Sequence, residues 1–388
     1  MSIISIFLLI LNIQVTAQAA ETSTLNSSVR ALGMGDAFTA VANDDSSLFY
    51  NPAGLARVRG LNWKVFDLDA GTSGLSAYSK FKNLKGGSGS GYANAIDELY
   101  GEHVALGAGG ETMFTMPMLG FGIYDHLGGL VEINNPVYPQ VHTKILNDYG
   151  YIMGAGIPAT PFLHLGADIK FVKRTGTDLY AGPSFLADLQ SSNIENQITG
   201  WGLGYGADLG ATAILPLPFF SAALSAAWKN VGGMTFKSPT SNDIPSEKNN
   251  ITLGAALTFD TLLVSITPAV DLIYLNDADL QLTRKINFGV EIALPLIALR
   301  GGFHEGYYTA GVGMNMGLFR VDAATYGVEL GDYPGQIQDR RYVLQFTMKL
   351  GVGNFSATGD SKSSANGGKA TASDNDSIWG SGRLKQRR

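Results

Sequence analysis

Apolar residues alternate with small or polar residues along most of the second half of the chain. In the clearest run, from Trp201 to Leu215, mainly larger apolar side chains occupy one face and glycine predominates on the other. The same period of two recurs at 251–259, 286–294 and 342–350, and it predicts β-strands. Soluble strands average about 5–6 residues, whereas a tilted strand needs about 9–11 residues to cross a bilayer. The length of the runs therefore favours membrane-crossing strands.

The connections between these runs alternate in length. Short breaks fall at Pro216–Phe219, Asp260–Thr261, Pro295–Leu296 and Gly317–Leu318, and longer polar stretches at Gly232–Asn249, Leu275–Leu280 and Gly331–Arg340. Short turns at one end and long loops at the other are typical of outer-membrane barrels. The alternating runs number about 12–14, and such barrels have an even number of strands.

The second face of each run distinguishes a membrane barrel from a soluble β-sandwich. Soluble strands present charged residues to water, but here that face carries mostly Gly, Ala, Ser and Thr. Inside a closed barrel, small residues leave room for a plug or a passage, while the apolar face meets lipid. We therefore predict an all-β fold, a transmembrane antiparallel β-barrel of about 14 strands. A soluble, β-rich secreted protein is the alternative, and Trp201 and Trp228 suit either an aromatic girdle or a core.

Composition supports the barrel and excludes one class of partner. Charged residues make up only 15% of the 388 residues, and glycine accounts for 49 of them. A soluble domain averages about 25% charged residues and about 7% glycine. The net charge of −6 argues against nucleic-acid binding, because no basic surface is available to neutralise phosphates. The chain has no cysteine, so it offers no disulfide and no thiolate ligand.

The N-terminus reads as an export signal. Ile3 to Ile13 is almost wholly apolar, and Ala17-Gln18-Ala19 supplies the small residues that precede a signal-peptidase cut. No Lys or Arg precedes the apolar run. An uncleaved anchor helix is the alternative, but the run is shorter than the roughly 20 residues that span a bilayer. We expect a cleaved signal peptide and a location in the outer membrane of a Gram-negative-type bacterium.

The pattern divides the chain into four parts. We expect a signal peptide at 1–19, an N-terminal plug of short helix and turn at 20–59, the barrel at 60–352 and a disordered tail at 353–388. The first strand is expected at Leu61–Leu68. An insertion with two short helical stretches around a Gly/Ser run is expected at about 75–100.

No catalytic or metal-binding motif stands out. The five histidines are scattered, and none has the spacing of an HExxH motif. Gly33-x-Gly35 lacks both a preceding strand and a third glycine, since Phe38 stands there. Neither Asp44-Asp45 nor Asp67-x-Asp69 belongs to a calcium-loop pattern, and a Gly-x-Ser-x-Gly match lies in the low-complexity run at 87–91. We expect no enzyme activity, no cofactor and no metal.

The stretch from Arg30 to Ala56, RALGMGDAFTAVANDDSSLFYNPAGLA, resembles the N-terminal signature of FadL-type outer-membrane transporters and their PorV-like relatives. Later similar segments are Lys229–Gly233 followed by Phe236 and Ile244-Pro245, then Gly289–Glu291, Leu299–Phe303, Ala310–Gly313 and Phe319–Asp322. The resemblance implies a 14-stranded barrel with an N-terminal hatch in its lumen. It also implies two alternative functions: passage of hydrophobic molecules such as long-chain fatty acids, or docking of secreted and envelope proteins. The partners would be outer-membrane lipid and either a hydrophobic small molecule or such proteins.

The hatch supplies the candidate site residues. Arg30, Asp36, Asp44, Asp45 and Asn51 are expected to hold it by polar contacts, Leu32, Met34, Phe38 and Phe49 to form an apolar lining, and Pro52 to shape the turn that follows Asn51. Both a gating hatch and a permanent stopper fit this pattern.

Overall fold

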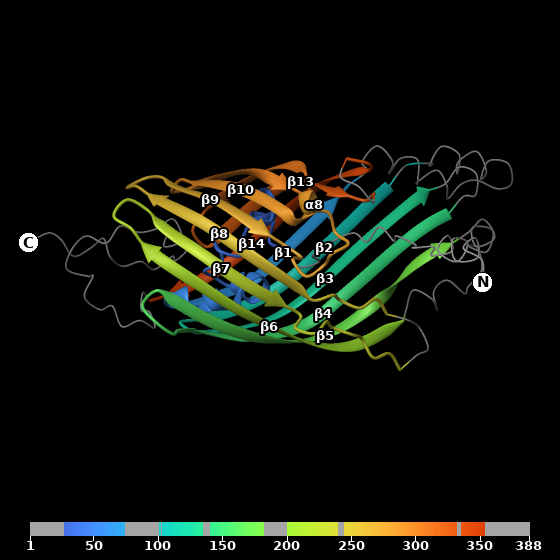
Figure 1. Ribbon diagram of the computed structural model, residues 1–388, viewed down its shortest axis with the longest axis horizontal. Helices are drawn as coiled ribbons and strands as arrows, with labels where there is room; N and C mark the ends of the chain where they lie inside the picture. The colour runs from blue at the N-terminus through green and yellow to red at the C-terminus, as the bar shows by residue number, and fades with distance from the viewer. Residues whose placement is uncertain are drawn as a thin grey trace, which may run out of the picture.

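The chain folds into a closed antiparallel β-barrel (Figure 1). The computed structural model describes residues 27–73, 101, 103–134, 140–181, 200–239, 244–331 and 335–353. Among these residues each strand pairs with its neighbours in sequence, and β1 closes the ring by pairing with β14. The predicted fold class and strand number are confirmed. The expectations for residues 1–19, for 75–100 and for 354–388 lie outside the described residues.

The strands follow the period-two runs closely. β6 (Trp201–Pro216), β8 (Asn250–Asp260) and β10 (Ile286–Ala293) match their predicted limits within one residue. β1 (Leu61–Thr72) and β14 (Gln338–Val352) are longer than predicted. The others are β2 (His103–Met116), β3 (Leu119–Asn134), β4 (Gln140–Pro158), β5 (Leu163–Ala181), β7 (Ser221–Lys229), β9 (Ser265–Leu272), β11 (Ile297–His304), β12 (Tyr307–Asn315) and β13 (Phe319–Glu329).

The barrel is taller on one side than on the other. β4 and β5 each have 19 residues, whereas β9, β10 and β11 each have 8. The connections after the even-numbered strands are short and share one end, to which β14 also runs (Figure 1). The other end carries the longer connections, including α8 (Leu282–Lys285) between β9 and β10. The expected alternation has one exception there, because β11 and β12 are joined by a two-residue turn.

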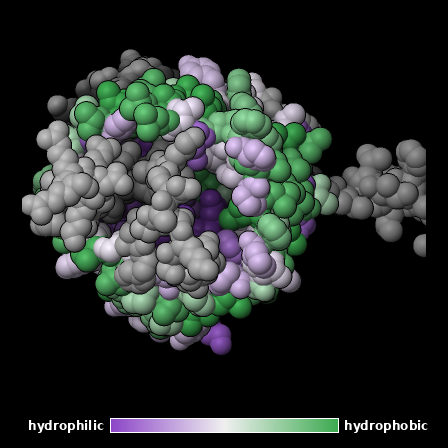
Figure 2. All heavy atoms as spheres, turned by 90° about the vertical axis from the view of Figure 1, so that its left-hand side faces the viewer, coloured by the Kyte–Doolittle hydropathy of each residue, from purple (hydrophilic) through white to green (hydrophobic). Residues whose placement is uncertain are grey.

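The two faces of the strands differ as the pattern predicts. On β6, Tyr205 and Leu209 are exposed on the outside, whereas Asp208 and Thr212 are buried on the inside. Trp228 is also exposed on the outer face. Figure 2 shows the end with the short connections, where hydrophobic residues surround a hydrophilic recess. None of the helices in the described ranges is long and apolar enough to cross a membrane.

The described residues that precede β1 lie inside the ring of strands (Figure 1). We call residues 27–60 the N-terminal segment. It contains α2 (Val29–Gly33), α3 (Ser47–Tyr50) and the 3-10 helix η1 (Pro52–Arg57). Gly35 and Asp36 after α2 have φ angles of 63° and 59°, a left-handed turn that reverses the chain. Most of its side chains are buried, although it takes part in none of the strand pairing described here.

A closed barrel of this kind predicts resistance to detergent. The protein should partition with the outer-membrane fraction, and the unheated protein should migrate faster in a denaturing gel than the boiled protein, because the hydrogen-bonded ring persists in detergent until heated. Recovery in a soluble fraction, with identical mobility before and after boiling, would contradict this architecture.

Candidate functional site

The N-terminal segment fits against wall positions that have no side chain. A Cβ atom at Gly302 would lie 2.9 Å from the backbone nitrogen of Gly35, and one at Gly156 would lie 2.7 Å from the nitrogen of Ala56. At Gly166 and Gly289 it would collide with the backbone of the segment. Glycine at these inward positions therefore lets the segment backbone contact the sheet directly. Pro52 lies against this surface, beside Gly166 and Gly210.

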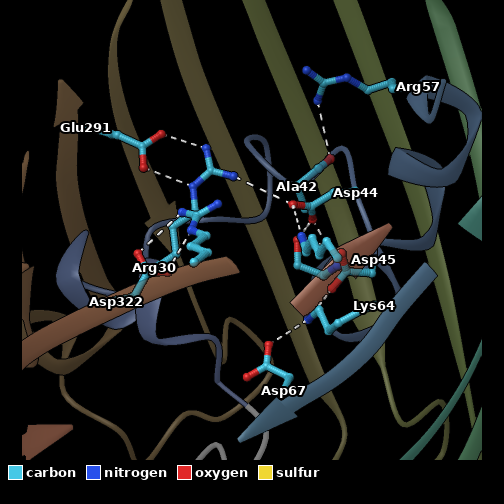
Figure 3. Close-up of polar contacts among 12 residues, drawn as sticks. Arg30, Ala42, Asp44, Asp45, Arg57, Lys64, Asp67, Glu291 and Asp322 are labelled. Atoms are coloured by element: carbon cyan, nitrogen blue, oxygen red, sulfur yellow. Dashed lines mark hydrogen bonds and ion pairs between the residues drawn. The ribbon is translucent and has the colours of Figure 1, made fainter. Parts of the chain in front are cut away.

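Arg30 joins the segment to a buried chain of charges on the wall, which we call the arginine anchor (Figure 3). Its guanidinium donates two hydrogen bonds to Glu291 on β10, at 2.9 and 2.6 Å. Arg300 on β11 donates to the same carboxylate at 2.7 Å and to Asp322 on β13 at 2.6 Å. Burial alone lowers the pKa of Arg30, but Glu291 outweighs it, so the net pKa is raised and the group stays charged.

Asp44 and Asp45 meet lysines on β14 and β1, next to the strand that carries Asp322, in a cluster we call the aspartate anchor. Asp44 also lies 3.7 Å from Arg30, so the two anchors adjoin (Figure 3). Asp45 pairs with Lys64 of β1 and lies 2.9 Å from Lys349 of β14. Lys64 is 3.1 Å from Asp67, so the pairing continues along the wall. Burial on its own would raise the pKa of Asp45, but the two lysines outweigh it and hold that pKa well below its usual range. The pKa of Asp44 is also lowered, because Lys349 and Arg30 outweigh burial and the neighbouring Asp45.

A third set of contacts holds the middle of the segment. Asp271 on β9 accepts hydrogen bonds from the backbone N–H groups of Phe38 and Thr39, both at 2.9 Å. Asn51 donates to Thr212 of β6 at 3.0 Å, and its own oxygen accepts from the N–H of Ala53. These contacts satisfy backbone groups that have no helix or sheet partner.

Two other polar side chains of the segment make contacts within it. Asp36 accepts a hydrogen bond from Tyr50 at 2.6 Å, so it braces the segment internally and does not tie it to the wall. Arg57 donates to the carbonyl oxygen of Ala40 at 3.1 Å, and burial lowers the pKa of its guanidinium to about 10. Arg57 therefore remains charged at neutral pH.

The apolar candidate residues have two different surroundings. Met34 and Phe38 are fully buried, and they pack against the wall alanines Ala223, Ala256 and Ala269. Met34 fills space against the wall, and Phe38 also borders the smaller of the two cavities described next. Phe49 is partly buried and forms an edge-to-face contact with Tyr124 of β3 at 5.3 Å.

Two adjoining cavities lie between the segment and the wall. The larger, of about 120 Å³, is bordered by Leu32 together with Leu130, Tyr326 and Val343. The smaller, of about 40 Å³, is bordered by Arg30, Phe49 and the charged residues of the aspartate anchor. Ser27, Asp69 and His126 border both. The larger cavity thus combines apolar residues with Asp69, His126, Lys144 and Arg341, and it adjoins a more strongly charged one.

The wall partners of the anchors were absent from the sequence prediction of site residues. They are charged residues at inward positions of the strands: Lys64, Asp271, Glu291, Arg300, Asp322 and Lys349. A charge on the inward face is the signal that could have identified them, because a buried charge needs a partner. Three of the stretches that carry the family resemblance, 289–291, 299–303 and 319–322, meet Arg30 in the arginine anchor.

No family model matches the chain, and no curated protein matches its sequence. Among solved structures it is similar to the toluene transporter TbuX of Ralstonia pickettii, with 13% identity over 85% of this chain and 98% of that chain and a TM-score of 0.48. It is similar to the toluene transporter TodX of Pseudomonas putida, with 11% identity, coverages of 84% and 97% and a TM-score of 0.45. It is also similar to a FadL homologue of Pseudomonas aeruginosa, with 12% identity over 83% of this chain and 97% of that chain and a TM-score of 0.28. The barrel architecture itself follows from the strand pairing.

The arginine anchor predicts energetic coupling between Arg30 and Glu291. Glu291→Met leaves two buried guanidinium groups short of a partner, and such a change costs about 3–5 kcal/mol of unfolding free energy. Arg30→Met/Glu291→Met should cost less than the sum of the single changes by about 0.5–3 kcal/mol. Urea unfolding in lipid vesicles measures this cycle. Lys248→Met, in an exposed pair with Asp277, is the control expected to have little effect. Strict additivity would contradict the coupling.

The aspartate anchor predicts how acid acts on the segment. Because the folded-state pKa of Asp45 lies below the unfolded value of about 3.9, its ionised form stabilises the fold above that pH and the contribution is lost as pH falls through the folded pKa. Asp45 should therefore contribute no change in planar-bilayer conductance between pH 8 and pH 5, and its protonation should raise the conductance only below about pH 4. In Asp45→Asn this acid response should be diminished. A rise between pH 7 and pH 5 would show that another group controls the closure.

Proposed function

We propose that this protein is an outer-membrane barrel that lets small hydrophobic molecules pass passively, and that the N-terminal segment is the hatch that must shift to open it. The observation that carries the proposal is the way the segment is held. It lies in the lumen but belongs to none of the described strand pairs, and buried ion pairs attach it to the wall at β10, β14 and β1. Such an element can move while the hydrogen-bonded ring stays closed.

The larger cavity supports a hydrophobic cargo. Leu32, Leu130 and Val343 border it, and its volume of about 120 Å³ is close to that of apolar cavities of about 150 Å³ that take up benzene. A fatty-acid-like chain is longer than this space allows, so its passage would require displacement of the segment. Passive passage of an apolar molecule needs no reacting group.

The wall beside the larger cavity is unusually thin. Gly71, Gly107 and Gly128 stand in register on β1, β2 and β3, so the sheet consists of bare backbone along this row. The outward-facing Leu106 and Leu127 also border the cavity. A hydrophobic molecule at this point lies next to the lipid-facing surface of the barrel, which favours a route from the lumen into the bilayer over one through water.

A docking role for secreted or envelope proteins was the other expectation. No feature of the described residues favours it, because the buried charges and both cavities bordering the segment face the lumen. Transport of hydrophobic molecules is therefore the function we propose.

The proposal predicts faster uptake when the hatch is loosened. Arg30→Met/Glu291→Met removes one anchor without leaving a lone buried charge, so the barrel should fold. Proteoliposomes with this variant should take up the hydrophobic dye 1-N-phenylnaphthylamine roughly tenfold faster than wild type, which corresponds to about 1.4 kcal/mol. Asp279→Asn, at an exposed position outside the N-terminal segment and both anchors, serves as the control and should behave as wild type.

A second dye separates a hatch from a simple stopper. Entrapped calcein, which is polar and highly charged, should be retained by wild type during hydrophobic uptake. Failure of wild type and variant alike to take up any hydrophobic probe would refute the transport function.

A further inference from the structure

The connection between β7 and β8 turns back into the barrel at the end with the long connections. We call its described residues, 230–239 and 244–249, the inserted loop. Met234 and Phe236 of this loop are buried, with 4% and 9% of their surface exposed. They belong to the same hydrophobic cluster as Leu48 and Leu55 of the N-terminal segment. The inserted loop therefore covers the segment from the side opposite to the short connections.

The inserted loop rests in a groove that has no side chains. Gly202, Gly204 and Gly206 stand at alternate inward positions of β6. A Cβ atom at Gly202 would lie 2.9 Å from Cβ of Phe236, and one at Gly204 would lie 2.8 Å from its ring. At Gly206 the nearest atoms would include the sulfur of Met234, at 3.3 Å. The three glycines form a flat backbone floor, which we call the glycine groove, and Phe236 fills it.

Arg174 on β5 latches the loop in this position. Its guanidinium makes a bidentate pair with Asp148 of β4, with both hydrogen bonds at 2.7 Å. It also donates to the carbonyl oxygen of Pro245 at 2.8 Å and contacts Glu247. The centre of the guanidinium lies 4.4 Å from the ring centroid of Phe236. The ring is thus held between an arginine and a glycine floor.

The inserted loop also completes the wall at this point. β7 pairs with β6 only along Leu209–Pro216, and beyond that stretch the loop backbone takes its place. Leu203 and Lys237 exchange two hydrogen bonds, at 3.0 and 2.9 Å, and Val231 donates to Ala207 at 2.8 Å. Release of the loop breaks this short set of bonds and leaves the strand pairs intact.

We propose that the glycine groove is the entrance site for a flat apolar molecule of about the size of one aromatic ring. In the closed state the protein's own Phe236 occupies this site, and the inserted loop is the lid that moves away to open it. This inference rests on the proposed transport function. The ligand class follows from the two wall surfaces that enclose Phe236 and stay in place when the loop moves. The backbone floor of β6 accepts a planar group, and the guanidinium of Arg174 stacks on a ring face. An incoming ring replaces the same contacts, so the exchange needs little net energy.

A reversible cross-link tests the lid. Leu203→Cys/Lys237→Cys places two cysteines at a hydrogen-bonded antiparallel pair, whose Cα atoms are about 5.5 Å apart and within disulfide reach. The chain has no other cysteine, so the bond is specific. Oxidation should reduce uptake of 1-N-phenylnaphthylamine by about tenfold or more and reduction should restore it, because a stapled lid cannot open. Thr235→Cys/Ser246→Cys, which staples the loop only to itself, is the matched control and should transport in both redox states.

The outcomes separate the two proposals. If wild type takes up the dye and the Leu203→Cys/Lys237→Cys variant takes it up equally in the oxidised and reduced states, the lid proposal is refuted and the transport function is retained. Absence of uptake in every form overturns both.

A binding measurement tests the groove directly. In detergent-solubilised protein, Phe236→Ala should bind benzene, a probe of one aromatic ring, roughly tenfold more tightly, because a buried aromatic side chain no longer competes for the site. Gly204→Leu in the Phe236→Ala background should abolish that gain, since its side chain fills the same space. Equal affinity of wild type and Phe236→Ala would show that benzene does not use the glycine groove.

Discussion

The structure depends on charges that are buried inside a barrel. An arginine or a carboxylate in the lumen is costly unless it is paired, and the pairing between Arg30, Glu291, Arg300 and Asp322 meets that cost within one network. Because one member belongs to the N-terminal segment and the others to the wall, neither part is satisfied alone. The ion pairs therefore fix the position of the segment without making it part of the sheet. That separation of a fixed ring from an attached element is what a hatch requires.

Glycine residues in the wall make the close packing of the segment against the barrel sterically possible. At Gly302 and Gly156 the wall admits the backbone of the segment, and at Gly202 and Gly204 it admits the ring of Phe236. At Gly71, Gly107 and Gly128 no side chain fills the space, and the larger cavity lies there. The high glycine content thus serves two purposes: close contact where the lumen is filled, and a thin wall where it is open. The buried ion pairs then stabilise the contacts between segment and wall, and the glycine positions determine where close contacts can form.

The sequence revealed the barrel more fully than the site. A period of two is a local property, so the run from Trp201 to Leu215 placed β6 within one residue. Contacts such as Arg30 with Glu291 join residues 261 positions apart, and no local pattern specifies them. Met34 is a packed side chain, whereas Phe38 both packs against the wall and borders the smaller cavity, and apolar character alone cannot distinguish these two situations. The inward position of the inserted loop was not predicted, for a related reason. Among its described residues the polar stretch after Gly232 carries two buried apolar side chains, Met234 and Phe236. The glycines against which they pack belong to another strand.

The central claim is that the N-terminal segment is an independently releasable element inside a fixed barrel. Hydrogen exchange in lipid nanodiscs tests it most directly, by comparing wild type with an Arg30→Met/Asp45→Asn variant in which both anchors are weakened. We predict that amides of residues 29–57 lose protection in the variant while those of β4 and β5 keep theirs. Loss of protection in segment and strands together would contradict the claim, because it would show that the segment and the barrel form one cooperative unit.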